Sequence, residues 1–363
     1  MELRERARAH MPGGNTRTTV YVPPHPPYAV RGERHFVTDA DGHTVIDLQA
    51  NMSALVHGHS HPAIVAAIDL RHGLSFGLPT ESEVRLAEHL TGRVPALERV
   101  RFANSGTEAV LGAIRTARAV TGKDLILRFA GCYHGVGESV MDGRGVPPQA
   151  TIVVPWGDVD AFRAALSDEI AAVIVDLMPS RAGLQPASPE FVAALRDRGD
   201  ALLIVDEVIT FRLGPGGLAP ELGVMPDLVT LGKTIGGGLP VGAFGGREDV
   251  MAVLDPRAPD HLEHGGTFNA NPVVMRAGLA GLELLDEPAI ARINALGDAL
   301  RERLRDAGYE VSGRGSLTRV FGADWWRLYR AGVLIGHSGL TCISTTMDEA
   351  TIEEVAERFE AAR

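Results

Sequence analysis

The chain has 363 residues and a formal net charge of −11, because 46 aspartates and glutamates outnumber 35 lysines and arginines. This acidic balance argues against nucleic acid or an anionic membrane surface as the main partner. No apolar run approaches the roughly 18 residues of a membrane span. The start MELRERARAHMPGG lacks an apolar signal core, and only two cysteines are present. We therefore expect a cytoplasmic protein in a reducing compartment.

The first 45 residues are rich in proline and lead into a hairpin-like pattern, FVTDADGHTVIDL, with Asp41-Gly42 as the turn. Beyond them, short apolar runs predict strands and alternate with amphipathic runs that predict helices. The predicted strands are Leu125–Phe129, Thr151–Val154, Ala172–Leu177, Leu202–Asp206 and Leu228–Leu231. The predicted helices are Glu81–Arg93, Glu108–Thr121, Val159–Leu166, Pro189–Arg198, Val274–Leu285 and Pro288–Ala307.

Strands that alternate with helices predict an α/β fold, in which helices cover both faces of a mostly parallel sheet. Residues 46–285 would form this large domain. Residues 1–45 and 286–363 would form a smaller domain that ends in a helix starting at Asp348. Ligands of such sheets bind beyond the carboxyl ends of the strands, so we expect the site in the loops after the predicted strands.

Glycine is over-represented, with 42 residues where an average chain of this length has about 25. The clusters include Gly13–Gly14, Gly236–Gly238, Gly245–Gly246 and Gly265–Gly266. We expect them to form turns in which the backbone approaches a phosphate, a planar ring or a partner subunit.

Three segments carry candidate chemistry. Ser105 and Glu108 have capping-box spacing after an apolar run, and such a helix start can bind an anion. An apolar strand ends at Asp206, and Lys233 stands between an apolar strand and a triple glycine. Burial would lower the pKa of this lysine and make it an amine nucleophile. Singly, the first two segments are more often structural; together the three supply the anion site, acid and amine that pyridoxal phosphate requires.

The chain resembles the class III aminotransferases, which are pyridoxal-phosphate enzymes of fold type I. Within them it is most similar to the branch of glutamate-1-semialdehyde 2,1-aminomutase and the β-amino-acid aminotransferases. The matching motifs, in order, are PGGNTR (12–17), DADGHTVIDL (39–48), GHSHP (58–62), SFGLPTESEVRLAE (75–88), RFANSGTEAV (101–110), GCYHG (131–135), DEVITFR (206–212), GKTIGGGLPVGAFGG (232–246) and GGTFNANP (265–272). The resemblance implies a mostly parallel mixed sheet and a smaller α+β domain. It also makes the alternating histidines of VHGHSHP a family turn rather than a metal site.

The resemblance assigns roles by position. Lys233 would hold pyridoxal 5′-phosphate as a Schiff base and then move a proton to and from the substrate Cα. Asp206 would pair with the protonated pyridine nitrogen. Val208 would pack on one face of the ring, and Tyr133 would stack on the other with His134 beside it.

The phosphate would be bound by Ser105, Gly106 and Thr107 of the same subunit. Thr267 would reach the phosphate of the neighbouring subunit, which implies an obligate homodimer. Arg17 matches an arginine that binds the substrate carboxylate in the β-amino-acid branch, since a planar guanidinium suits bidentate carboxylate recognition. The alternative for Arg17 is a surface arginine in an N-terminal arm.

Three features depart from the family pattern. DEVITFR lacks the glycine of DEVxTGFR, which shortens the loop after Asp206 by one residue. After Phe321 the family usually has a further strand and helix, and Trp325 and Trp326 would cover the surface that their loss exposes. The stretch 336–339, GHSG, lacks the arginine with which the β-amino-acid branch binds a keto-acid carboxylate.

We therefore expect a pyridoxal-phosphate aminotransferase that moves an amino group between a carboxylate-bearing amino acid, such as a β-amino acid, and a keto acid or aldehyde. An intramolecular aminomutase or an amino-acid racemase stays open as the alternative, because these need only one bound substrate. A non-catalytic protein of the same fold is a third alternative. The joint presence of Lys233, Asp206, Tyr133 and Thr267 argues against that third one.

Overall fold

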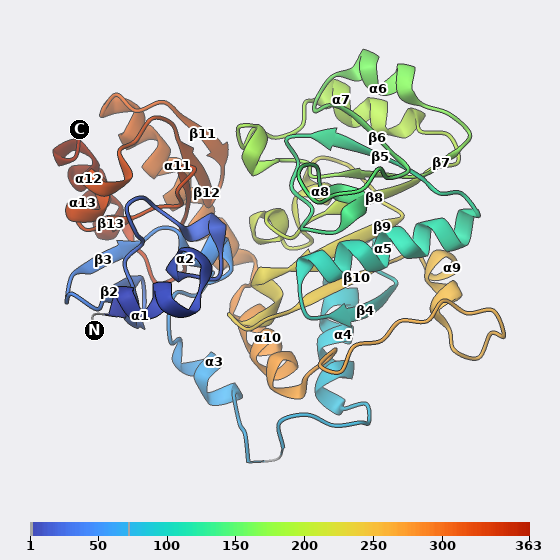
Figure 1. Cartoon of the computed structure of the whole chain (residues 1–363), viewed down its shortest axis with the longest axis horizontal. Coiled ribbons are helices and arrows are strands. Elements are labelled where there is room, and N and C mark those ends of the chain that lie inside the picture. The colour runs from blue at the N-terminus through green and yellow to red at the C-terminus, as the bar shows by residue number, and fades with distance from the viewer. Residues whose placement is uncertain (1–2, 72) are drawn as a thin grey trace.

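The computed structural model describes residues 3–71 and 73–363. Its larger part contains a seven-stranded sheet in the order β4-β10-β9-β8-β7-β5-β6 (Figure 1). The strands are β4 (Arg99–Ala103), β5 (Leu125–Ala130), β6 (Thr151–Pro155), β7 (Ile170–Val175), β8 (Leu202–Asp206), β9 (Leu228–Gly232) and β10 (Gly242–Gly246). Within this sheet β10 runs antiparallel to both of its neighbours and the other pairs are parallel. The predicted α/β fold with a mostly parallel mixed sheet is confirmed.

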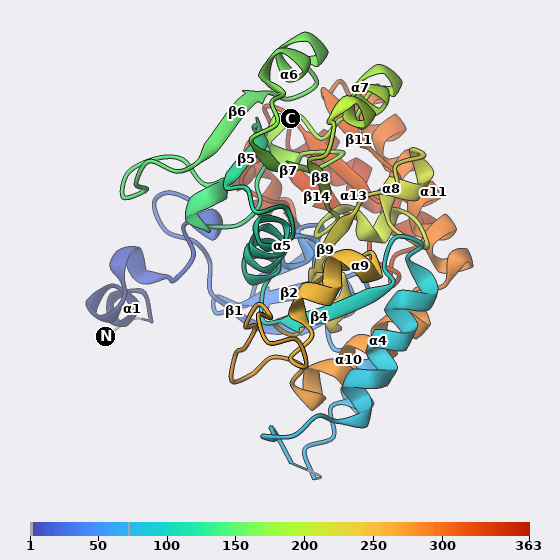
Figure 2. The same cartoon turned by 90° about the vertical axis from the view of Figure 1, so that its right-hand side faces the viewer.

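Helices cover both faces of this sheet (Figures 1 and 2). They are α4 (Glu81–Arg93), α5 (Gly106–Thr121), α6 (Val159–Ala165), α7 (Pro189–Ala194), α8 (Leu218–Glu221), α9 (Glu248–Met251) and α10 (Pro272–Leu284), whereas α3 (Pro62–Ala67) packs on α10. Leu203 and Val205 of β8 join a core with Phe162 of α6. Leu202 and Ile204 of the same strand join another core with residues of α5. Because alternate residues face opposite sides and both sides are buried, the strand is apolar throughout.

The predicted bounds hold for α4 and β8, and the other predicted elements shift, most of them by one or two residues at an end. The largest shifts are in β7 and α7. The predicted strand Ala172–Leu177 begins two residues earlier, at Ile170, and ends at Val175. It ends there because the Asp176 carboxylate accepts the backbone N–H of Met178 and turns the chain. The predicted helix Pro189–Arg198 ends at Ala194 and tightens into a 3-10 turn.

Strand β10, Gly242–Gly246, corrects our interpretation of the Gly245–Gly246 cluster as a turn. Glycine is unfavourable in most strands, so its sequence gives no strand signal. A Cβ at Gly242 would collide with the Ser105 backbone, and one at Gly246 with the Asp227 backbone. These glycines therefore serve close backbone packing at both ends of β10, and only Gly242, paired with Gly232, lies beside Lys233.

The N- and C-terminal segments lie together, as the blue and red ribbons of Figure 1 show. Their strands are β1 (Ala29–Glu33), β2 (Phe36–Asp39), β3 (Thr44–Asp47), β11 (Val311–Arg314), β12 (Leu317–Val320), β13 (Val333–Leu334) and β14 (Leu340–Cys342). Their helices are α1 (Leu3–His10), α2 (Ala50–Ser53), α11 (Glu287–Asp306), α12 (Trp325–Arg330) and α13 (Glu349–Ala361). The β2–β3 hairpin has the predicted turn, and β13 pairs in parallel with β3.

One hydrophobic core joins these two segments, since Ile46 and Leu48 pack with residues of α11 and α13. Ile46 and Leu48 thus join the core of the terminal segments although they fall within the predicted large domain, residues 46–285. The division into that domain and a small domain of residues 1–45 and 286–363 stays a prediction. Trp325 is partly buried against this core and its indole N–H donates to the Ile335 carbonyl at 2.9 Å. No helix among residues 3–71 and 73–363 is long and apolar enough to cross a membrane.

Candidate active site

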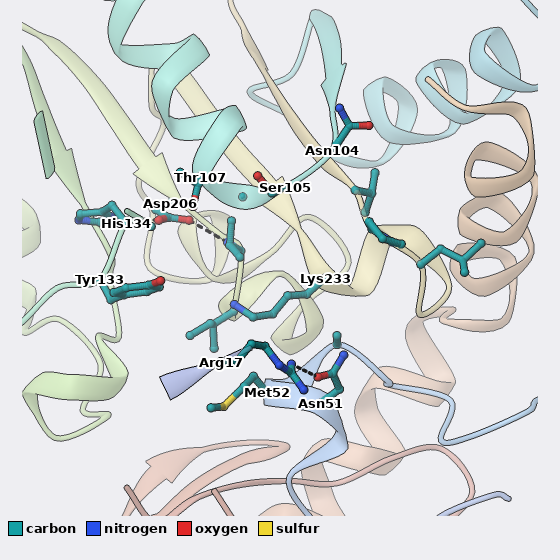
Figure 3. A pocket seen from close by; sticks show the side chains of 18 of the residues that line it. Arg17, Asn51, Met52, Asn104, Ser105, Thr107, Tyr133, His134, Asp206 and Lys233 are labelled. Carbon is teal, nitrogen blue, oxygen red and sulfur yellow. Dashed lines mark hydrogen bonds and ion pairs between the residues drawn. The ribbon is translucent and has the colours of Figure 1, made fainter. Parts of the chain in front are cut away.

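A cavity of about 510 Å³ opens at the carboxyl ends of the central strands. This size lies within the range of small-molecule sites. Asp206 is the last residue of β8, Lys233 follows β9, and Tyr133 and His134 lie beyond β5. Nine of the ten predicted site residues line it, most of them labelled in Figure 3: Arg17, Ser105, Gly106, Thr107, Tyr133, His134, Asp206, Val208 and Lys233.

The anion end of the cavity is the start of α5. Ser105 is the N-cap, and its hydroxyl accepts the Glu108 backbone N–H at 3.2 Å. The Glu108 carboxylate accepts the backbone N–H of Asn104 at 2.6 Å, one residue before the expected capping-box partner. The first N–H groups of a helix have no partner within it, so Gly106 and Thr107 present donors to a phosphate.

Small residues keep this end open for a flat ligand. A Cβ at Gly106 would lie 3.1 Å from a methyl group of Val208, the residue predicted to pack on a ring face. Gly135 has φ +93°, and a Cβ there would collide with Thr107. Gly135 is therefore required by this packing, and at Gly106 a side chain would press against Val208.

The carboxylate of Asp206 is held from two sides. It is 5% exposed, and it accepts the Val208 backbone N–H at 3.0 Å and lies 2.8 Å from Nδ1 of His134. His134 is also buried, and its Nε2 is without a hydrogen-bond partner among the described residues. A histidine that donates from Nδ1 orients the carboxylate toward the cavity. By contrast, the neighbouring Glu207 accepts the N–H groups of Leu218 and Ala219 and serves the structure.

Lys233 is surrounded by buried groups. Burial lowers the pKa of its ammonium, against the attraction of Asp206 and Asp176. A lower pKa keeps more of the amine neutral and nucleophilic. Its φ of +48° lies in the left-handed region that L-residues avoid. Of the 35 basic residues only Lys123 and Lys233 are lysines, a scarcity that the sequence prediction did not use.

Asp176 is a cavity residue that the sequence prediction missed. It follows β7 as Asp206 ends β8, so the same strand-end rule could have found it. Burial and the nearby Asp206 raise the pKa of its carboxyl to about 7. The raised pKa favours the protonated form of the Asp176 carboxyl at neutral pH.

Tyr133 has a second missed neighbour. The Arg181 guanidinium carbon lies 4.0 Å from the centre of the Tyr133 ring. Arg181 is exposed and does not line the cavity. A cation against the face of an aromatic ring is attractive, so Arg181 restrains the ring that would stack on a ligand.

Arg17 reaches the cavity from the N-terminal arm. Its Nη1 donates to Oδ1 of Asn51 at 2.7 Å (Figure 3). Asn51 and Met52 line the same cavity, although the sequence prediction did not include them. The structure therefore places the predicted carboxylate-binding residue in the cavity that contains Lys233.

Thr267 is the predicted residue that does not line this cavity. It lines another cavity of about 520 Å³, formed with residues 75–80 and 264–272. Several large apolar side chains in and near these segments are exposed: Leu70, Leu74, Phe76, Leu78 and Phe268. Its predicted contact with the phosphate of a neighbouring subunit stays a prediction.

The mostly parallel sheet, with a partly buried lysine and a buried aspartate at adjacent strand ends, defines a fold-type I enzyme dependent on pyridoxal phosphate. A family model described as Aminotransferase class-III matches residues 20–142 and 152–361. The chain belongs to the class III aminotransferase family.

Individual relatives divide between two activities. The chain is 42% identical over 354 residues to glutamate-1-semialdehyde 2,1-aminomutase of Thermomicrobium roseum, covering 88% of this chain and 82% of that protein. It is 36% identical, with a TM-score of 0.93, to a solved β-phenylalanine aminotransferase from Variovorax paradoxus, covering 98% and 91%. A solved transaminase with pyridoxal phosphate bound is 41% identical, with a TM-score of 0.96, covering 99% and 96%.

The cavity fits this cofactor. A helix N-terminus lies at one end, the orphaned Nε2 of His134 and the oriented Asp206 lie at another, and the Gly106 position leaves room over Val208. The amine of Lys233 is the group that the cofactor aldehyde requires.

Proposed function

We propose that the protein is an aminotransferase that moves an amino group between a carboxylate-bearing amino acid, in particular a β-amino acid, and a keto acid or aldehyde. The observation that carries this proposal is that Arg17 and Lys233 reach into one cavity (Figure 3). A guanidinium binds a carboxylate while an amine serves the cofactor. A site with both selects substrates that carry an acid near the reacting amine.

Different side chains of the cavity would have different roles in this reaction. Pyridoxal phosphate, when bound, supplies an aldehyde for the amino group and an electron-withdrawing ring that makes the Cα proton acidic. Lys233, with its lowered pKa, holds the cofactor and then takes up and returns the Cα proton. Asp206, oriented by His134, pairs with the ring nitrogen. Ser105, Gly106 and Thr107 bind the phosphate.

A specific observation favours the alternative, an aminomutase of the glutamate-1-semialdehyde type or a racemase. Among the described residues that line the cavity, Arg17 is the only arginine. His337, from the stretch where a second arginine was sought, lines a neighbouring cavity of about 280 Å³ together with Arg17. An enzyme with one carboxylate receptor suits a reaction with one bound substrate.

The two activities separate in a half-reaction without any keto acid. An amino donor is added to the holoenzyme, and products are followed by chromatography and cofactor absorbance. Transfer predicts one equivalent of keto product and loss of the absorbance of the lysine-bound cofactor. Catalytic formation of an isomer without an acceptor would instead establish the mutase or racemase reaction.

We also propose that two copies form the active assembly, with Thr267 contacting the cofactor phosphate of the partner copy. The exposed apolar side chains near Thr267 support such an interface. Light scattering should give twice the chain mass, and Thr267→Val should weaken cofactor binding severalfold without changing that mass. A monomer that binds the cofactor tightly would contradict both statements.

A further inference from the structure

Residues 50–53 form a left-handed turn of four consecutive non-glycine residues. Their φ values are +43°, +49°, +58° and +70° for Ala50, Asn51, Met52 and Ser53. L-residues avoid this region because Cβ crowds the following carbonyl, and they visit it mostly as single residues. Such a turn persists only where its surroundings determine it, and strain of this kind gathers at functional sites.

Contacts from three directions hold this turn. The Asp47 carboxylate accepts the backbone N–H groups of Gln49 and Ala50, each at 2.9 Å. The backbone N–H of Leu55 donates to the Ala50 carbonyl at 3.0 Å. The fully buried Arg212 donates to the Ser53 carbonyl at 3.4 Å. The turn is therefore part of the framework and its direction is fixed.

The turn presents Asn51 to the cavity beside Arg17. Asn51 Oδ1 accepts a hydrogen bond from Nη1 of Arg17 at 2.7 Å. Among residues 3–71 and 73–363 no other hydrogen bond or ion pair reaches this guanidinium. Its other N–H groups and its whole positive charge therefore stay available in the cavity.

The group that accepts the hydrogen bond from Arg17 is the uncharged amide of Asn51. An aspartate in the same place would also accept from Arg17, but it would neutralise the charge and compete with a substrate carboxylate. Asparagine orients the guanidinium while leaving its charge uncompensated. Asparagine is also the non-glycine residue, with aspartate, that best tolerates a left-handed backbone.

We propose that Asn51 is a positioning residue that holds one edge of the Arg17 guanidinium with an uncharged acceptor and turns the opposite edge toward the substrate carboxylate. This inference rests on the proposed function in one respect, the role of Arg17. It adds that selectivity for carboxylate substrates is set by the Asn51 amide, which the turn presents, as well as by the arginine.

The test compares two substrates that differ only by the acid, 3-aminobutanoate and butan-2-amine. Asn51→Asp keeps the size and the backbone preference of the residue but adds a charge. Asn51→Gly removes the side chain and relaxes φ at that position. Ser53→Gly relaxes the neighbouring position without touching Arg17, and serves as the matched control.

We expect Asn51→Asp to raise KM for 3-aminobutanoate by about tenfold or more, the size of a charge-assisted contact, with kcat nearly unchanged. Asn51→Gly should raise it by roughly threefold, because the guanidinium is freed but keeps its charge. KM for butan-2-amine should not change in either variant, and Ser53→Gly should match the wild type. The double variant Arg17→Ala/Asn51→Gly should be no worse than Arg17→Ala, because both act through one contact and neither adds a charge.

A binding measurement avoids dependence on turnover. Propanoate is titrated into the holoenzyme, and its binding is read from the cofactor absorbance and by calorimetry. Asn51→Asp should weaken propanoate binding by the same factor as KM, while the dissociation constant of the cofactor itself should not change.

The outcomes separate the two proposals. If Arg17→Ala loses carboxylate selectivity and Asn51→Asp retains it, the inference about Asn51 is overturned and the proposed function stands. If Arg17→Ala also retains selectivity, or the wild type does not bind propanoate, then the carboxylate role of Arg17 is wrong and the inference falls with it.

Discussion

The two halves of the cavity are built in different ways. Around Lys233, the chemical groups come from the ends of β8 and β9 and from the start of α5, and Asp206 is almost fully buried. Around Arg17, the groups come from an exposed N-terminal arm and from a left-handed turn. The part of the cavity around Lys233, the cofactor half, is thus built from strand ends of the sheet. The part around Arg17, the substrate half, is built from segments outside the sheet.

The residues proposed to carry out the chemistry therefore lie on other elements than the residues proposed to select the substrate. Strand ends are fixed by the pairing of neighbouring strands, so the positions of the lysine and the aspartate follow from the fold. The arm lies outside the sheet and is exposed at Arg17, so it can change without disturbing the strand ends, whereas the turn at residues 50–53 holds Asn51 in place beside it. Relatives named for different substrates are consistent with this arrangement. The following changes test it, from the largest expected effect to the smallest.

Lys233→Ala should abolish the covalent attachment of the cofactor and nearly all activity. We expect activity to fall by roughly 10⁴-fold or more, because a general acid–base group and the covalent attachment are both lost. The visible absorbance of the lysine-bound cofactor should disappear. Lys123→Ala is the matched control, because these two are the only lysines in the chain. Borohydride reduction followed by peptide mapping should label Lys233 alone; label on Lys123 would contradict the assignment.

Asp206→Asn should reduce activity by roughly 10³-fold, since the ring nitrogen loses its charged partner in a buried place. The protein should still fold, because the amide keeps the size of the side chain and its oxygen can accept the Val208 backbone N–H, while the contact with His134 loses its charged acceptor. Single-turnover kinetics should show a slow proton-transfer step with substrate binding retained. Normal turnover by this variant would remove Asp206 from the chemistry.

Arg17→Ala should act only on the substrate half. We expect kcat/KM for carboxylate substrates to fall by about 10- to 100-fold, the value of a charge-assisted bidentate contact. Simple amines and the affinity for the cofactor should be unaffected. An equal loss with butan-2-amine would show that Arg17 does not bind the substrate carboxylate. It would also contradict the proposal that the residues around Arg17 act on substrate selection alone.

Asp176→Asn should change the pH dependence of stability in the cofactor-free protein. Burial raises the pKa of Asp176 from 3.8 to about 7, so the folded state binds its proton more tightly than the unfolded state. The folded state therefore loses stability as pH rises from about 4 to about 7. Between pH 5 and pH 8, the wild type should lose roughly 2 kcal/mol or more relative to the variant. Urea denaturation at the two pH values measures this, and parallel curves would show that Asp176 is ionised throughout.

Arg181→Gln should have the smallest effect. The cation over the Tyr133 ring is exposed, and such contacts contribute about 0.5–1 kcal/mol. We expect a two- to fivefold weaker affinity for the cofactor, measured by absorbance titration. Lysine at this position should restore part of the affinity, whereas selectivity for carboxylates should not change.

Much of the cofactor half could be predicted from local sequence. A run of apolar residues that ends in a carboxylate marks Asp206, and a small-residue turn before a helix marks Ser105. The arrangement of the substrate half could not be predicted in this way. Asn51 and Arg17 are separated by 34 positions. No local pattern in the sequence indicates that residues 50–53 form a left-handed turn.

The sequence by itself determined the alternation of strands and helices, the order of the motifs and the kind of chemistry at the strand ends. These depend on neighbours a few residues apart, which set hydrophobic periodicity and turn preference. Only the tertiary structure decided that β10 is a strand, that Asp176 joins Asp206, and that an uncharged amide orients Arg17. Such contacts join distant segments, and they arise from strand order and domain packing rather than from local preference.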